Sequence, residues 1–235
     1  MKIKCLGSGS KGNSYSIDDG KSVLLLEAGL KANVILKGYY EQLDRISGCF
    51  ITHEHSDHAK AAIQIHNSGI PIYASRGTFD GLNIKTSGYG YHVIKAGVQY
   101  YSGSYIILPW KAQHDCREPL GFLIYSTVTN EKLLFATDTY YIPNRFTDLN
   151  FIMVECNYSE KILRENINQG SINRTLAKRL EESHFSLENV KEFLKANDLS
   201  KCDEIYLIHL SGVNSDKKQF KTEIQSVTGK IVTVL

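Results

Sequence analysis

Residues 52–59 read Thr-His-Glu-His-Ser-Asp-His-Ala, and this stretch decides how the rest of the sequence is interpreted. It places three histidines and two carboxylates within six residues. The apolar residues before it predict a strand, so His53 and His55 point to the same side of the chain. Asp57 and His58 follow as the chain turns into a helix. One short turn therefore offers two imidazoles to one metal ion, and an aspartate with an imidazole to a second.

The spacing H-x-H-x-D-H favours a metal site over its alternative, a polar helix cap with stray histidines. Neutral imidazole and carboxylate groups suit zinc and other borderline divalent ions. Six of the eight histidines lie at the ends of predicted strands or in adjoining loops, where ligand groups converge in α/β proteins. The other two, His66 on a helix face and His92 in a strand, are interpreted as ordinary packing residues. The six are His53, His55, His58, His114, His184 and His209.

Composition sets limits on the class of protein. The chain has 235 residues, 42% of them hydrophobic, which is enough for one sizeable core. Its 27 Lys/Arg and 25 Asp/Glu leave a net charge of +2, without the basic stripe typical of proteins that hold long nucleic acid. Five widely spaced cysteines without a C-x-x-C argue against a disulfide framework. We expect a cytoplasmic protein, because neither a signal peptide nor an apolar run of membrane-spanning length is present.

The predicted elements alternate between strands and helices, with a strand-rich middle. No internal repeat or linker interrupts them. The predicted strands are Ile3–Leu6, Tyr15–Ile17, Ser22–Glu27, Cys49–Thr52, Pro71–Ala74, Tyr91–Lys95, Ser104–Lys111, Gly121–Val128, Lys132–Ala136, Phe151–Cys156, Glu204–His209 and Lys230–Val234. The predicted helices are Asn33–Leu43, Lys60–Asn67, Asn173–Glu182, Leu187–Asn197 and Asp216–Ser226. This order predicts an α/β fold, a four-layer αββα sandwich in a single domain over residues 1–235.

The motif THEHSDH resembles the signature of the metallo-β-lactamase superfamily, and its other motifs follow in the same order. His114 in KAQHDCREPLGF resembles the third histidine of that family. Asp138 in LLFATDTYY resembles the bridging aspartate, and His209 in EIYLIHLSG the last histidine. The resemblance covers nearly the whole chain and implies the metallo-β-lactamase fold.

The same resemblance implies a centre of two divalent metal ions, zinc in the first place and manganese or iron as alternatives. By carry-over of the motifs, the first ion has the ligands His53, His55 and His114, the second has Asp57, His58 and His209, and Asp138 bridges the two. The superfamily includes lactamases, thioesterases, lactonases and nucleases, so its fold alone does not select a substrate.

Two further residues narrow the choice. His184 in EESHFSLENVKEF precedes a predicted helix whose N-cap is Ser186, and it resembles the histidine of tRNase Z-type phosphodiesterases that faces the leaving group. Glu155 in FIMVECNY resembles the glutamate that orients this histidine. Phosphodiester cleavage needs such a pair, because an alkoxide leaving group must gain a proton. The alternatives are a solvated loop histidine and a structural ion pair.

A closer resemblance is to the YycJ/VicX branch of the superfamily. It rests on GSGSKGNSY at 7–15, LLLEAGL at 24–30, HDCREPLGF at 114–122 and SHFSLENV at 183–190. Members of this branch are described as DNA exonuclease-like or as metallohydrolases, and a related phage-borne group degrades cyclic nucleotides. The loop at 7–15 has two open interpretations: a phosphate-binding loop or a tight turn between strands.

The chain departs from the branch pattern near the expected site. Glu27 stands where aspartate is usual, and Ser183 and Phe185 replace the common glycine and leucine around His184. Tyr140 stands where glycine is common. None of these changes removes an expected metal ligand. A tyrosine at this position reshapes the pocket, so the departures concern the substrate more than the chemistry.

We therefore expect a di-metal phosphodiesterase acting on a nucleotide-type substrate, with a cyclic nucleotide favoured because no polyanion track is evident. In this hypothesis Asp57 holds metal and orients the nucleophile, while His184, backed by Glu155, protonates the leaving oxygen. The alternatives are a DNA exonuclease, a thioester or lactone hydrolase on the same metals, and a metal-binding module without catalysis. The resemblance and the tyrosine-rich segment 89–105 also suggest a homodimer, although tyrosines build sheet faces as well, and base stacking is the less favoured alternative.

Overall fold

The computed structural model describes residues 1–235, and the chain divides into two compact units. Unit 1 comprises residues 1–111 and 116–131, and unit 2 comprises residues 112–115 and 132–235. The short segment 112–115 therefore contributes His114 to unit 2. The organisation as one domain stays a prediction.

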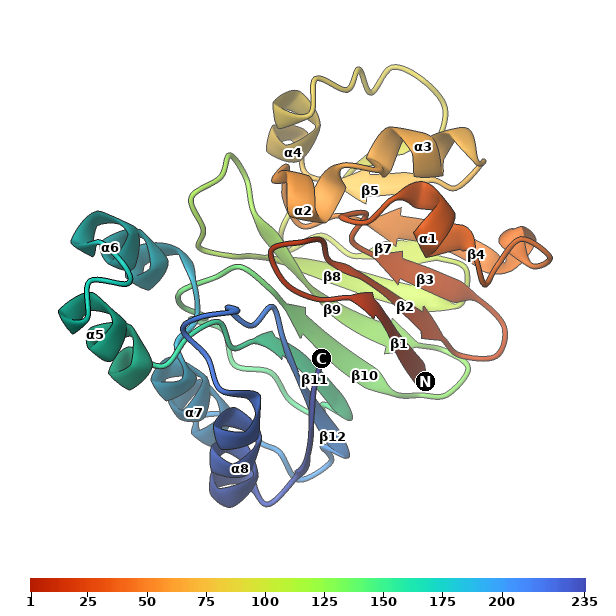
Figure 1. The fold of residues 1–235 in the computed structure, drawn as a ribbon. Coiled ribbons are helices and arrows are strands. Elements are labelled where there is room, and N and C mark those ends of the chain that lie inside the picture. Colours follow the sequence, from red (N-terminus) through yellow and green to blue (C-terminus); the bar gives the residue numbers. More distant parts are fainter. The chain divides into compact units, whose positions relative to one another are not determined.

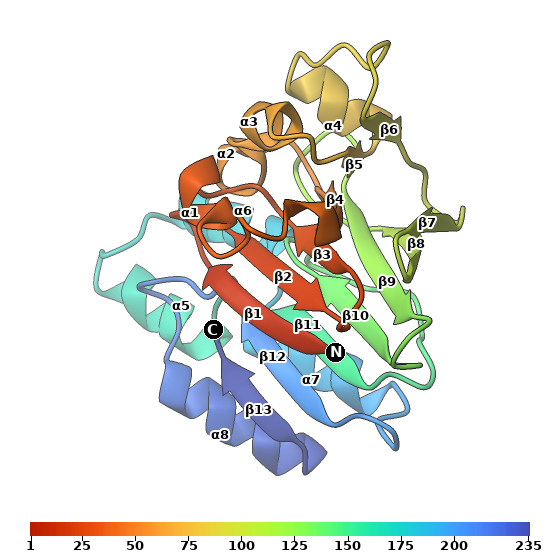
Figure 2. The ribbon, with the colours of Figure 1, turned by 90° about the vertical axis from the view of Figure 1, so that its right-hand side faces the viewer.

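Unit 1 contains a six-stranded sheet whose strands follow the order of the sequence. Its first two pairs, β1 with β2 and β2 with β3, are antiparallel, and the later pairs are parallel. Figure 2 shows β1 to β4 side by side, with α1, α2 and α3 on one side of them. The strands are β1 (Lys2–Gly7), β2 (Ser14–Asp18), β3 (Val23–Leu26), β4 (Ile46–Phe50), β5 (Ile72–Ala74) and β6 (Tyr91–Val93).

Short helices cover one face of this sheet. In β3, Val23 and Leu25 join a buried cluster with residues of the helices, such as Ile65 and Phe79. Leu24 and Leu26 alternate with them and are equally buried, so both faces of the strand are covered. The helices are α1 (Ala32–Leu36), the 3-10 turn η1 (Leu43–Arg45), α2 (Ser56–Ala59), α3 (Ala62–Asn67) and α4 (Arg76–Gly81).

The remaining strands of unit 1, β7 (Tyr100–Ser102), β8 (Tyr105–Lys111) and β9 (Leu120–Ser126), form antiparallel pairs. Phe122 of β9 meets Phe50 of β4 edge to face, with ring centroids 5.6 Å apart. This contact packs β9 against the end of β4, immediately before the histidine-rich turn.

Unit 2 is built on parallel strands. Strands β10 (Lys132–Ala136), β11 (Phe151–Glu155), β12 (Glu204–Ile208) and β13 (Ile231–Val234) pair in this order. Their carboxyl ends therefore lie at one edge, which is where ligand groups gather in parallel sheets. Figure 1 shows α7 and α8 beside these strands, with α5 and α6 as a separate pair. The helices are α5 (Glu160–Asn168), α6 (Arg174–Ser183), α7 (Leu187–Lys195) and α8 (Lys217–Thr228).

Most predicted elements are present, and two predicted helices were wrong in extent. The helix predicted at Asn33–Leu43 ends at Leu36, and turns that include Gly38 follow it. The helix predicted at Lys60–Asn67 begins two residues later, at Ala62, because the Ala61 N–H donates to the carbonyl of Ala28 instead of an intrahelical acceptor. Strand β7 and helices α4 and α5 were not predicted. None of the helices has the length and hydrophobicity needed to cross a membrane.

Candidate metal centre

The histidine-rich turn begins two residues after β4 and is held by a buried carboxylate. Glu27 is fully buried, and its two oxygens accept from the Thr52 N–H at 3.3 and 3.4 Å. His53 Nε2 faces His55 Nδ1 at 3.0 Å. The Thr52 hydroxyl lies 2.9 Å from His53 Nδ1, and an N–H at that position leaves the lone pair on Nε2. Two ring nitrogens thus converge as two ligands of one metal ion would.

His58 lies behind this pair, with its ring centroid 4.2 Å from that of His53. The Asn13 side-chain amide donates to His58 Nε2 at 3.1 Å, so this nitrogen carries a lone pair. An Asp57 oxygen lies 3.5 Å from the same nitrogen, and a Glu27 oxygen lies 3.6 Å from Nδ1 on the other side of the ring. The Nε2 lone pair and the Asp57 carboxylate therefore point to a common place in unit 1.

Backbone hydrogen bonds fix the turn against two neighbouring loops. The Asn13 N–H donates to the Asp57 carbonyl at 2.7 Å, and the Gly29 N–H donates to the Asn13 carbonyl at 2.8 Å. A Cβ at Gly29 would lie 1.7 Å from the Asp57 carbonyl oxygen, so only glycine fits this approach. The loop at 7–15 thus contacts the turn directly, while phosphate binding by this loop stays a prediction.

In unit 2, three of the predicted site residues follow parallel strands. Glu155 ends β11, His209 follows β12, and Asp138 comes two residues after β10. Asp138 and His209 both have left-handed backbones, with φ of 45° and 52°. Such conformations are unfavourable for residues with a Cβ and gather at functional sites. With these backbone turns, the Asp138 and His209 side chains lie within hydrogen-bonding distance of each other.

The side chains of these residues form one connected group. His209 Nδ1 lies 2.8 Å from an Asp138 oxygen and 3.1 Å from a Glu155 oxygen. His114 Nδ1 donates to the Ser183 carbonyl at 2.8 Å, which leaves a lone pair on Nε2, 3.6 Å from the other Asp138 oxygen. Burial lowers the pKa of His114, and this favours the neutral imidazole that binds metal.

His184 is joined to the group through Glu155. His184 Nδ1 donates to Glu155 Oε1 at 2.6 Å, while the other oxygen accepts from the N–H groups of Thr139 and Phe185. Burial alone would lower the pKa of His184, but the adjacent Glu155 carboxylate raises it above its ordinary value. Ser186 caps α7 by accepting from the Asn189 N–H, as predicted. This cap fixes the chain just after His184.

The donor chemistry in each unit fits a divalent metal. Asp138, Glu155, His184 and His209 offer ligand atoms within 4.8 Å of one another in unit 2, and His53 with His55 does so in unit 1. Imidazole nitrogens with carboxylate oxygens suit zinc, manganese or iron. The seven-residue ligand set and its division between two ions stay predictions. The sequence did not reveal the contacts of Asn13 and Glu27 with His58, because they join residues far apart in the chain.

The histidines predicted to be ordinary lie in aromatic stacks. His66 stacks on Tyr91 with ring centroids 3.9 Å apart, and His92 stacks on Tyr73 at 4.5 Å. Within the tyrosine-rich segment, Tyr105 is buried in the sheet. The Tyr105 side chain packs inside the protein. It therefore does not test the predicted homodimer.

Comparison with known proteins gives consistent results. The family model described as "Beta-lactamase superfamily domain" matches residues 25–210. The chain is 26% identical over 240 residues to "Exodeoxyribonuclease YycJ" of Bacillus anthracis, covering 97% of this chain and 89% of that protein. It is 28% identical over 234 residues to "Exodeoxyribonuclease WalJ" of Streptococcus pneumoniae serotype 2, covering 93% and 84%. Among solved structures, the metallo-β-lactamase fold protein YhfI of Bacillus subtilis matches with a TM-score of 0.73 at 15% identity, covering 99% and 95%.

Proposed function

Because the chain belongs to the metallo-β-lactamase superfamily, we propose that it is a metal-dependent phosphodiesterase that releases nucleotides from DNA ends. The predicted α/β metallo-β-lactamase fold is confirmed by the family match and by the similarity to a solved structure of that fold. The observation that carries the proposal is the 2.6 Å hydrogen bond between His184 and the buried Glu155. The relatives named as exodeoxyribonucleases, which align over most of the chain, support DNA as the substrate.

We propose that the predicted seven-residue ligand set binds two divalent metal ions. Two divalent ions, when bound, supply positive charge to phosphate oxygens and lower the pKa of a water molecule. Zinc fits the donors, as do manganese and iron. By the resemblance of the motifs, His53, His55 and His114 would hold the first ion, Asp57, His58 and His209 the second, and Asp138 would serve both.

His184 serves as the general acid in this proposal. Glu155 holds Nδ1, so Nε2 is the nitrogen that gives its proton to the leaving oxygen. A carboxylate behind an imidazole fixes its tautomer and stabilises the imidazolium, as in hydrolytic triads. Asp57, beside His58 on the histidine-rich turn, has the second role of orienting the attacking water.

The reaction balances without an additional reactant. A water oxygen forms a bond to phosphorus, and the bond from phosphorus to the leaving sugar oxygen breaks. The proton from His184 goes to that sugar oxygen, and the proton lost by water restores the acid. The products are a nucleotide and a DNA strand shortened by one residue.

A cyclic nucleotide is the second candidate, and the balance of charge favours it. The chain carries 27 Lys/Arg against 25 Asp/Glu. Several of the basic side chains are paired, as in Arg45 with Asp18 and Lys191 with Glu223. A small diester needs fewer cationic contacts than a long polyanion, so this composition suits it.

A substrate panel separates these candidates. The purified protein is incubated with Mn²⁺ or Zn²⁺ and with end-labelled linear DNA, closed circular DNA, or cyclic mononucleotides. We expect mononucleotides from linear DNA and intact circles, because an exonuclease needs an end. Hydrolysis of cyclic mononucleotides alone would replace the proposal by the second candidate.

A thioester and a lactone test the remaining alternative, a hydrolase that does not act on phosphodiesters. A thioester or lactone hydrolase would act on neutral esters and would not need a general acid for an alkoxide leaving from phosphorus. Turnover of a lactone or thioester, together with inert DNA and inert cyclic nucleotides, would contradict the phosphodiesterase assignment.

A further inference from the structure

We propose that Asn157 is a positioning residue that holds His209 in the orientation needed to bind the second metal ion. The inference rests on the proposed function, because it takes His209 as a ligand of that ion. It adds a residue that has no assigned role in the predicted site. Asn157 follows the carboxyl end of β11, two residues after Glu155, and all the residues involved lie in unit 2.

The backbone of His209 needs support from its neighbours. Its φ of 52° is left-handed, a conformation that is unfavourable for a residue with a Cβ. The Asn157 side-chain amide donates to the His209 carbonyl at 2.8 Å. The Ser211 N–H donates to the Asn157 carbonyl, also at 2.8 Å. Asn157 therefore holds the turn at two points, one of them on the residue that carries the imidazole.

The orientation of this imidazole leaves one nitrogen for a metal ion. His209 Nδ1 lies 2.8 Å from Asp138 Oδ1 and 3.1 Å from Glu155 Oε1. A proton on Nδ1 serves these carboxylates, and the lone pair is then on Nε2. Because the ring is attached to the turn, a shift of the His209 backbone moves Nε2 and Nδ1 together. The hydrogen bond from Asn157 thus acts on the metal ligand through the main chain.

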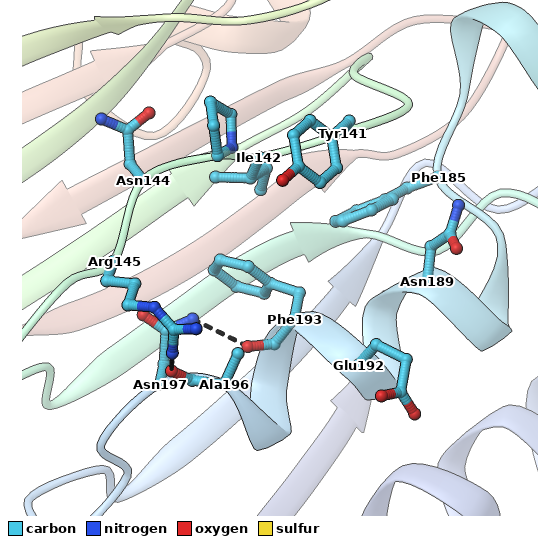
Figure 3. Close-up of a pocket in the computed structure, with 11 residues that line it drawn as sticks. Tyr141, Ile142, Asn144, Arg145, Phe185, Asn189, Glu192, Phe193, Ala196 and Asn197 are labelled. Carbon is cyan, nitrogen blue, oxygen red and sulfur yellow. Dashed lines mark hydrogen bonds between the residues drawn. The ribbon is translucent and has the colours of Figure 1, made fainter.

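Asn157 is itself firmly anchored. Its side chain is buried, and its N–H donates to the Phe185 carbonyl at 2.9 Å. Phe185 is buried in turn, with its ring centroid 6.1 Å from that of Phe193. Figure 3 shows these two rings facing the same hollow. A donor anchored in this way cannot readily follow the His209 carbonyl if the turn opens, and positioning requires this rigidity.

Stability alone does not explain an asparagine at this position. Asn157 Oδ1 is buried, and no group of the chain donates a hydrogen bond to it. An unsatisfied buried carbonyl oxygen is costly, and an apolar side chain of the same shape would avoid this cost. A polar group left unsatisfied in this way has a reason other than packing. We attribute the amide to the bond that its nitrogen makes with His209.

Zinc binding tests the inference independently of catalysis. Zn²⁺ is titrated by calorimetry into the metal-free full chain, as wild type and as Asn157→Asp, which keeps the shape but places an oxygen against the His209 carbonyl. We expect wild type to bind two equivalents. The variant binds one of them about 10- to 100-fold more weakly, the usual effect of losing a residue that supports a metal ligand, and the other with unchanged affinity.

Asn166→Ala is the matched control. The Asn166 side-chain amide also ties the chain after β12, by donating to the Val213 carbonyl at 3.0 Å and to Asn214 Oδ1 at 2.8 Å. These bonds lie beyond Ser211, farther along the loop than His209. We expect this variant to unfold at lower urea concentration while both zinc affinities stay unchanged. An equal loss of zinc affinity in both variants would mean that Asn157 only stiffens the loop, and would overturn the proposal.

A second variant and a second metal make the test independent of one substitution. Asn157→Ala removes the donor without adding a charge and shows the same selective loss, so it decides the outcome if Asn157→Asp does not fold. With Co²⁺ in place of Zn²⁺, the absorption of one bound ion changes in this variant and that of the other does not. Wild-type zinc affinities together with a wild-type cobalt spectrum in Asn157→Ala would refute a positioning role.

The two proposals fail in different ways. If linear DNA is cleaved but the Asn157 variants bind both zinc ions as wild type does, the positioning role is wrong and the phosphodiesterase stands. If the Asn157 variants lose one ion selectively but no phosphodiester is cleaved by wild type, the positioning role stands and the proposed function is wrong.

Discussion

Glu155 carries four hydrogen bonds from one fully buried position. Its Oε1 faces His184 and His209, and its Oε2 accepts from the N–H groups of Thr139 and Phe185. Burial alone would raise the pKa of this carboxyl group, but the charge and hydrogen bonds of its histidine neighbours keep the pKa below its ordinary value. An ionised carboxylate is therefore held between the proposed acid and a proposed metal ligand.

Replacing Glu155 by glutamine tests this role. The change keeps the volume but turns one acceptor oxygen into a donor, which then faces another donor. We expect kcat to fall by about 10- to 100-fold, and the free energy of unfolding by about 1–3 kcal/mol, the cost of an unsatisfied buried group. Steady-state kinetics and urea denaturation measure the two effects. Exposed Glu181→Gln is the control, and wild-type kcat in the Glu155 variant would contradict a positioning role.

Replacing His184 by alanine separates acid catalysis from metal binding. General acids contribute about 10²–10⁴-fold to rate, so we expect kcat on a phosphodiester to fall within that range. Metal content, measured by atomic emission, stays at the wild-type ratio because His184 is not among the seven proposed ligands. Loss of metal from this variant would show that the residue had been assigned the wrong role.

At the residue scale, candidate site residues were predictable where the sequence places a histidine or a carboxylate after a predicted strand. His53, His114 and Asp138 could be selected in this way, whereas His184 and Glu155 were selected through their resemblance to a family motif. The left-handed backbone conformations at Glu27, Asp138 and His209 could not be predicted from the sequence. They depend on neighbouring loops that hold an unfavourable conformation, and nothing in the local sequence encodes that support.

At the scale of elements, the close approach of two loops shapes the histidine-rich turn. We expect Gly29→Ala to destabilise unit 1, because its Cβ would lie 1.7 Å from the Asp57 carbonyl oxygen and backbone must move. The effect is a loss of several kcal/mol in thermal or urea unfolding, together with weaker metal binding. Gly20→Ala, where a Cβ meets nothing but the backbone has a positive φ, separates steric overlap from backbone strain.

The turn between β2 and β3 is tied to β8 and β9 by another carboxylate. Asp19 accepts from the hydroxyls of Ser104 and Ser126 at 2.6 and 2.7 Å, and from the N–H groups of Lys21 and Ser22. Burial alone would raise the pKa of Asp19, but these hydrogen bonds together lower it below its ordinary value.

We expect Asp19→Asn to lower the free energy of unfolding at pH 7 by about 1–3 kcal/mol. A depressed pKa stabilises the fold above the unfolded value, about 3.9, and this contribution is lost as the pH falls through the folded pKa. The difference in the free energy of unfolding between wild type and the variant is therefore constant near neutral pH and becomes smaller in acid. Urea denaturation at several pH values measures it, and a difference that does not change with pH would contradict this account.

Element boundaries were predicted best where local and tertiary signals agree. Lys132–Ala136 was predicted to the residue as β10, since an apolar run there ends in a polar turn. The interruption between α2 and α3 could not be predicted, because the acceptor of the Ala61 N–H is Ala28, far away in the sequence. Helix α5 has Leu163 and Ile167 at helical spacing, a signal that was present but was not used.

At the scale of the whole molecule, the α/β fold class followed from the alternation of predicted strands and helices, and the order of the motifs indicated the superfamily. Each proposed metal-binding motif follows a strand, and their order matches one superfamily along the chain. The division into two compact units has no such signal. Its boundaries, at residues 111–116 and 131–132, carry no glycine- or proline-rich linker. The homodimer stays a prediction, because a subunit interface leaves no unambiguous pattern in one sequence.

The balance of charge leads to a last prediction, on the salt dependence of DNA binding. Each phosphate neutralised by Lys or Arg adds about −0.9 to the slope of log affinity against log salt concentration. With a net charge of +2 and several cations already paired, we expect contact with only about two or three phosphates, and a slope of about −2 to −3. Fluorescence anisotropy of end-labelled DNA with the His184→Ala variant, from about 50 to 200 mM salt, measures the slope.

A shallow slope has a functional consequence. An enzyme that contacts few phosphates dissociates readily after each cleavage. It therefore degrades DNA distributively, one nucleotide per binding event, instead of processively. Trap DNA added during the reaction should therefore stop further shortening of labelled strands at once. A slope near −8 (about nine phosphates), with shortening that continues in the presence of the trap, would mean that the fold gathers its basic residues into a track that the balanced composition conceals.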